Sequence, residues 1–313
     1  MSNPFTRLRP LWAGLALLAV LAIALSFPSV QALASNFLSL FRVQQVTALP
    51  LDMAALKDSR YDPSLGETLA PLIAQQVTFT RKPAKAQDIA DPAQASGLAG
   101  FNVRLSSDPN QALSRLMLQP GLAFEGSFDR ALAEQALQAL VKSGQVPALP
   151  GELDGAKVRV SVPDGVSAAY GKCRYNTDPA ATTVTGSPTL GIGDKCLVLV
   201  QVPGPKVETP PDLPVARLAE IGLRALGTSP EQAARLAAQI DWTTTLVIPI
   251  PRGQVDSRQL AVDGVQGTLL TQAAGQGSLQ PGYSLVWVKN GIVYAILGTG
   301  DPAAGLALAS SLK

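Results

Sequence analysis

A charge-free apolar run near the N-terminus constrains this 313-residue chain most, because it decides the compartment in which the rest of the chain folds. The run covers Leu11–Phe27 and follows Arg7 and Arg9, and residues 1–34 hold no acidic side chain. Its 17 residues span about 25 Å as a helix, slightly less than the roughly 30 Å hydrocarbon core of a bilayer. Positive charge before such a run keeps the N-terminus on the cytoplasmic side. We therefore expect residues 35–313 to lie outside the cytoplasm.

Two forms of this N-terminal segment, residues 1–34, stay open. As an anchor, it is a single transmembrane helix through which the protein contacts the membrane. Apolar residues beyond Pro28 follow helical spacing, as in a helix that lies on the outer membrane surface, and this favours the anchor. As a signal peptide, Ala32-Leu33-Ala34 is a small-residue cleavage site, and the protein is secreted after cleavage at Ala34.

Composition excludes several classes of function. The chain has no histidine, which removes Ser-His-Asp and Cys-His catalysis and histidine-ligated metal sites. Arg7 and Arg9 account for the whole net charge of +2, so residues 35–313 are neutral and have no electrostatic attraction for nucleic acid. Gly298–Ala303 matches a glycine-rich dinucleotide pattern but is better explained as a strand-to-helix turn, and Asp241 as a turn residue. We expect a non-enzymatic protein with no catalytic residue, no cofactor and no metal.

Cys173 and Cys196 are the only cysteines, and they lie 23 residues apart. In an oxidising compartment an even number of cysteines indicates a disulfide. A single pair is too few for a zinc site, which needs four ligands. We expect a structural Cys173–Cys196 disulfide that stabilises the fold by roughly 3 kcal/mol.

Periodicity and turn residues indicate an α+β fold, in which antiparallel sheets pack against helices. A helix is expected over 129–142 with Ser127 as its cap, and two more begin near Pro214 and Ser229. The expected strands cover 41–51, 101–105, 157–162, 166–170, 197–202, 243–250, 259–262 and 267–271. A Pro/Gly-rich joint over 146–155 divides the exported part into a first module, 35–150, and a second module, 151–313.

The clearest local signal is a C-terminal hairpin. Two strands flank Asn290-Gly291, the pair that a type I′ turn prefers. This register sets Trp287 opposite Tyr294, and the two rings form either part of the core or a contact surface. Asp301 then begins a final helix.

Several stretches resemble a family. The membrane-proximal run SVQALASNFLSLFRVQQVTALPLD and the later stretches DWTTTLVIPIP, VDGVQGTLL and YSLVWVKNGIVYAILGTG resemble bacterial membrane-anchored anti-sigma factors in their extracytoplasmic part. That part is similar in outline to the sigma-E regulatory and lipoprotein-carrier type of sheet-and-helix sensor. Ten residues precede the apolar run, so the resemblance does not extend to a cytoplasmic sigma-binding domain.

Two functional hypotheses follow. The first is a membrane-tethered extracytoplasmic sensor or regulatory interaction domain, which recruits a protein partner through a sheet face or by strand addition at a sheet edge. Trp287 and Tyr294 are the candidate contact residues for this role. The second is an exported carrier that holds an apolar ligand, such as a lipid, in a groove lined by a sheet.

Overall fold

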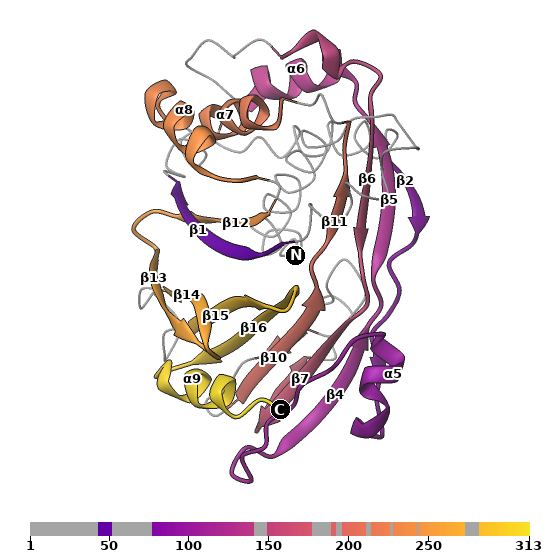
Figure 1. Cartoon of the computed structure of the whole chain (residues 1–313), viewed down its shortest axis with the longest axis vertical. Coiled ribbons are helices and arrows are strands. Elements are labelled where there is room, and N and C mark those ends of the chain that lie inside the picture. The colour runs from indigo at the N-terminus through magenta and orange to yellow at the C-terminus, as the bar shows by residue number, and fades with distance from the viewer. Residues whose placement is uncertain are drawn as a thin grey trace, which may run out of the picture.

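Two antiparallel sheets, of eight and four strands, form the frame of the molecule (Figure 1). The structure is a computed structural model, and it describes residues 43–51, 77–140, 149–176, 189–191, 196–210, 214–225, 228–242, 244–272 and 282–313. The predicted N-terminal segment, residues 1–34, lies outside these ranges. Among the described residues, no helix is long and apolar enough to cross a membrane.

The eight-stranded sheet has the order β13-β14-β15-β16-β10-β7-β4-β3, and all its neighbouring strands are antiparallel. Its strands are β3 (Gln87–Asp88), β4 (Leu113–Gln119), β7 (Gly165–Gly171), β10 (Cys196–Pro203), β13 (Val255–Val262), β14 (Val265–Gln272), β15 (Gly282–Lys289) and β16 (Ile292–Thr299). The four-stranded sheet has the order β11-β6-β5-β2. It contains β2 (Val77–Arg81), β5 (Leu122–Ser127), β6 (Lys157–Val162) and β11 (Lys206–Glu208).

The four-stranded sheet continues the strands of the larger one. Four ribbons run from β3 to β2, from β4 to β5, from β7 to β6 and from β10 to β11, in the same order in both sheets (Figure 1). Each ribbon is interrupted by a short connection that contains a proline, namely Pro83, Pro120, Pro163 or Pro205. Because proline has no N–H to donate to the ladder, this row of prolines separates one long bent surface into two sheets.

Asp164 holds the bend together. Its Oδ1 accepts a hydrogen bond of 2.5 Å from the Gly121 N–H and also pairs with the guanidinium of Arg81. The ribbons approach so closely here that a Cβ on Gly121 would lie 2.1 Å from the carbonyl oxygen of Val162. Glycine is therefore required at position 121.

A third layer is a two-stranded parallel sheet of β1 (Gln45–Leu51) and β12 (Thr245–Pro251). One face of this pair packs on β15 and β16 through Val46, Val286 and Val293. The other face packs on helices through Leu49 and Leu51. The structure thus confirms mostly antiparallel sheets with packed helices, with β1–β12 as a parallel exception.

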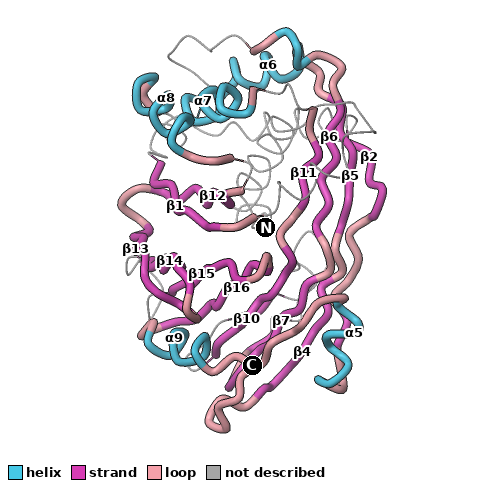
Figure 2. Tube along the Cα trace, in the orientation of Figure 1, coloured by secondary structure: helices cyan, strands magenta, loops and turns pink. Residues whose placement is uncertain are grey.

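The helices gather at two ends of the molecule (Figure 2). Helices α6 (Arg130–Leu140), α7 (Val215–Ala225) and α8 (Pro230–Gln239) lie at one end, and α5 (Ala95–Ala99) and α9 (Ala303–Ser310) lie at the other. Helices α5 and α9 help to bury the face of the large sheet opposite β1–β12. Single 3₁₀ turns cover Pro92–Gln94 and Gly151–Leu153, and a short separate hairpin joins β8 (Arg174–Asn176) to β9 (Thr189–Gly191).

Two local predictions are corrected. Residues 101–105 do not form a strand, because the backbone of Arg104 is hydrogen-bonded at both its N–H and C=O by the side chain of Gln201, and Leu105 pairs with Lys313. The helix after β5 is capped by Asp129, whose Oδ1 accepts from the Leu132 N–H at 3.0 Å, and Ser127 ends the strand. The strands without a counterpart among the predictions are β2, β3, β4, β5, β8, β9 and β11.

The predicted boundary near residue 150 falls between strands that share sheets. Strand β4 pairs with β7, and β5 pairs with β6 along its whole length. Each of the two sheets therefore contains strands from both sides of residue 150.

Candidate functional site

The predicted aromatic pair lies in the core. Trp287 and Tyr294 face each other in the hairpin register, with ring centroids 5.1 Å apart and planes 9° from parallel. Their exposed fractions are 0% and 3%. The two rings therefore form part of the core, which is one of the two roles expected for them, and they offer no exposed contact surface.

The predicted cysteine pair lies at disulfide distance, with 2.08 Å between the sulfur atoms of Cys173 and Cys196. Cys196 begins β10 opposite Gly171, which ends β7, and Cys173 follows two residues later. The pair therefore joins the ends of two neighbouring central strands. This position is that of a structural cross-link.

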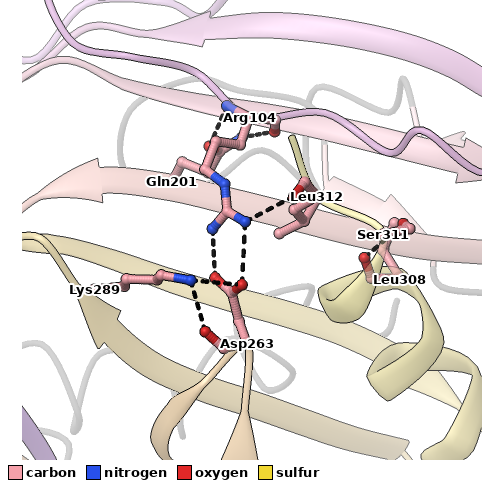
Figure 3. A network of polar contacts seen from close by, with 7 residues as sticks. All are labelled: Arg104, Gln201, Asp263, Lys289, Leu308, Ser311 and Leu312. Carbon is pink, nitrogen blue, oxygen red and sulfur yellow. Dashed lines mark hydrogen bonds and ion pairs between the residues drawn. The ribbon is translucent and has the colours of Figure 1, made fainter.

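A polar network joins four segments that are distant in sequence (Figure 3). Asp263 forms a double hydrogen bond with the guanidinium of Arg104 and accepts from Lys289 Nζ at 2.8 Å. Arg104 Nη2 also donates to the carbonyl oxygen of Leu312 at 2.7 Å, and its Cζ lies 5.7 Å from the centre of the Tyr294 ring. Asp263 holds this place because it occupies the left-handed position, φ 51°, of the tight turn between β13 and β14.

The electrostatics of this network fit a structural tie. Burial alone would raise the pKa of Asp263, but hydrogen bonds and charge from Arg104 and Lys289 outweigh it and hold that pKa below its ordinary value. The hydrogen bond to Asp263 raises the pKa of Arg104. With the carboxylate ionised and both of its oxygens occupied by cations, Asp263 is poorly placed to act as a base.

Two other motifs from the sequence also have structural roles. The carboxylate of Asp241 accepts from the Thr244 hydroxyl at 2.8 Å, and its carbonyl accepts from the Thr245 N–H, so it holds the turn into β12. Gly300 has φ 80°, and the Asp301 carboxylate caps α9 at the Ala303 N–H, 2.9 Å away. In the described ranges, no group of three His, Cys, Asp or Glu side chains is placed to hold a metal ion.

The four-stranded sheet has one apolar and one polar face. Directly opposed residues of neighbouring strands lie on the same face, and one row across the sheet consists of Phe79, Phe124, Val160 and Val207. The next row has the opposite character, because there Arg159 pairs with both Glu125 and Glu208. Alternation in KVRVSV, the sequence of β6, produces the two faces.

The apolar row becomes more exposed toward β2. Val160 is 7% exposed, Phe124 is half-buried, and Phe79 is 44% exposed. The Phe79 and Phe124 rings meet edge to face, with centroids 6.0 Å apart. Phe79 and Leu98 are the exposed large apolar residues of the described chain, and Phe79 is the one that lies on a sheet edge.

Strand β2 is an outer strand, and within the described part of the chain no other strand pairs with its outer side. Its side chains are exposed from Thr78 to Arg81, and the exposed Lys82 and Lys85 follow directly. We call Val77–Arg81 together with Lys82 and Lys85 the β2 edge. In the sequence, this strand could have been found from the β-branched and aromatic run VTFT, residues 77–80. The run is short and is followed closely by Lys82-Pro83.

These observations make the β2 edge the candidate functional site: an outer strand that combines an exposed aromatic ring, a group of cations and an outer side that no other described strand covers. In the described part of the chain, the aromatic pair lies in the core, the cysteine pair joins two strand ends and the Asp263 network joins a turn to neighbouring segments. Comparison of the chain with protein-family models, with curated proteins and with solved structures finds no match in any of the three.

Proposed function

We propose that this chain is a non-enzymatic, membrane-tethered extracytoplasmic sensor or regulatory interaction domain that recruits a protein partner along the β2 edge. The observation that carries the proposal is an outer strand exposed from Thr78 to Arg81, with Phe79 at 44%. An extended segment that pairs with such an edge gains main-chain hydrogen bonds and covers the apolar ring. The charge-free run Leu11–Phe27 supports the tether, and the resemblance to anti-sigma factors supports a regulatory role.

The other outer strands of the eight- and four-stranded sheets are less suited to this role. Strands β3 and β11 have two and three residues, which is too short to guide an added strand. Strand β13 is longer, but its exposed stretch carries Asp256, Arg258 and Gln259 and no exposed large apolar residue. Charged side chains of this kind protect a sheet edge from pairing.

The test is a photo-crosslinker placed at position 79 of the full chain in its native membranes. We expect p-benzoylphenylalanine at this position to form an adduct with a second protein, because the partner strand covers the Phe79 ring. The matched control places the same group at Val207, which lies in the same row at the opposite edge of the sheet. Equal protein adducts at both positions, or none at position 79, would refute recruitment at the β2 edge.

A second candidate function rests on the apolar row itself. Phe79, Phe124, Val160 and Val207 form a continuous apolar strip, which suits a carrier of an apolar ligand such as a lipid. The same crosslinking experiment separates the two functions by the mass of the adduct. A lipid attached at position 79, with no attached protein, would favour the carrier.

A further inference from the structure

We propose that the partner segment is extended and acidic, and that it lies beside β2 with its carboxylates at Lys82 and Lys85. This inference rests on the proposed function, because it names the chemistry of the partner that the β2 edge recruits.

The β2 edge has cations without matching carboxylates. Residues 77–87 contain Arg81, Lys82 and Lys85 and no acidic residue. The carboxylates that lie nearby in the fold pair with arginines: Asp164 with Arg81, Asp88 with Arg115, and Glu125 with Arg159. No carboxylate in the described part of the chain pairs with Lys82 or Lys85, both of which are exposed. Two solvated ammonium groups therefore stand at the end of a strand whose outer side has no partner strand among the described residues.

The same features disfavour a second copy of this chain as the partner. Pairing β2 with β2 would bring two groups of cations along one edge, which costs free energy through like-charge repulsion. The register between β2 and β5 also shifts between Phe79 and Arg81, and such an irregularity limits edge-to-edge pairing of identical strands. An acidic strand from another protein meets no such repulsion.

The alternation of β2 gives the expected pattern of the partner. Val77 and Phe79 lie on the apolar face, and Thr78 lies on the polar face between them. A strand added beside Val77–Phe79 needs an apolar residue at each alternate position, next to the Phe79 ring. The acidic residues of the added strand then lie at its end nearest Lys82 and Lys85. The fitting chemistry is a short apolar-alternating segment with a cluster of Asp or Glu at one end.

The test measures binding of two labelled peptides to the full chain in an uncharged detergent. Both peptides alternate valine with threonine and end in three charged residues, glutamate in one and lysine in the other. We expect the glutamate peptide to bind at least about tenfold more tightly at low salt, with the difference shrinking as salt rises. We also expect it to slow amide hydrogen exchange over Val77–Arg81. Equal binding of both peptides, or binding of neither, would overturn the inference.

Charge variants assign the effect to the two lysines. The double variant Lys82→Glu and Lys85→Glu should weaken binding of the glutamate peptide at least about fivefold, because two attractive charge contacts become repulsive. The control Lys206→Glu reverses one lysine charge at the opposite edge of the sheet, where Lys206 is the exposed residue of β11, and should leave binding within about twofold. An equal loss in the control would overturn the inference.

Three further outcomes keep the proposals distinct. Protein capture at position 79 without discrimination between the peptides would retain the proposed function and refute the acidic partner. Peptide discrimination without protein capture in native membranes would refute the proposed function and retain the chemistry of the edge. Phosphatidylglycerol vesicles that displace the glutamate peptide would assign the β2 edge to a membrane surface and overturn the protein-partner inference.

Discussion

Asp263 is the residue on which the C-terminal part of the fold depends most directly. It contacts Arg104 from the loop after α5 and Lys289 from the end of β15, and Arg104 in turn binds the carbonyl of Leu312. The Asp263 side chain is 9% exposed and that of Arg104 is 17% exposed, so solvent screens the pair weakly. Removing the charge of Asp263 leaves both cations without their carboxylate.

We therefore expect Asp263→Asn to lower the free energy of unfolding at pH 7 by roughly 2 kcal/mol, the scale of hydrogen bonds to charged groups. Because the pKa of Asp263 is depressed in the folded state, its contribution is present above the unfolded pKa of about 3.9 and is lost as pH falls through the folded pKa. The difference between the two proteins should therefore shrink below about pH 4.

Denaturant unfolding at pH 7 and at pH 3 measures this difference. Asp256→Asn is the control, because Asp256 is exposed on neighbouring β13, and its effect on unfolding at pH 7 should be small. A loss in Asp263→Asn that is equally large at both pH values would contradict the role of the ionised carboxylate.

At the scale of elements, turns with local chemistry were predictable. The hairpin turns Asp263-Gly264 and Asn290-Gly291 adopt positive φ angles at both residues, as their sequences require. The start of α8 was also predictable from the sequence, because serine commonly caps helices. In the structure, the Ser229 hydroxyl accepts a hydrogen bond from the Gln232 N–H. In each case the residues that decide the structure are adjacent in sequence.

Elements that depend on distant partners were not predictable in the same way. The apolar residues of β4 do not alternate as in a strand, because positions 113, 116 and 117 have helical spacing and 118 follows directly, and its partner β7 lies beyond residue 164. The candidate site was missed for a related reason. Strand β2 is an outer strand because of the strand order of the four-stranded sheet. No local run of residues determines this order. Burial of Trp287 likewise depends on helices α5 and α9, although its register with Tyr294 was predictable.

The bend between the two sheets gives a prediction at this scale. Gly121→Ala should destabilise the protein by roughly 1–3 kcal/mol, because its Cβ would lie 2.1 Å from the backbone oxygen of Val162 and would force the ribbons apart. Gly97→Ala is the matched control, because a Cβ there meets nothing within 4 Å and the residue lies within α5. Thermal unfolding should show Gly97→Ala unchanged or stabilised by up to about 1 kcal/mol. A fall in melting temperature of similar size in both would contradict the close approach.

At the scale of the whole molecule, β1 packs against two layers: the large sheet on one face, and helices α7 and α8 on the other. Val46 packs against Val286 and Val293 of the large sheet, whereas Leu49 packs against Leu223 of α7 and Ala233 of α8. Strand β1 is also the first described segment after the predicted anchor. Strand β1 therefore contacts both the large sheet and the helices α7 and α8.

The two faces of β1 predict separate effects on the two layers. Leu49→Ala should cost roughly 2–5 kcal/mol, since Leu49 is 6% exposed and its loss leaves a cavity beside the helices. Amide hydrogen exchange should rise in α7 and α8 more than in β15 and β16, because local opening follows the weakened contacts. Val46→Ala is the matched variant on the opposite face, and it should raise exchange in β15 and β16 while sparing α7 and α8. If both variants changed exchange in the same elements, β1 would not separate the layers, and the sheet and helices would open as one unit.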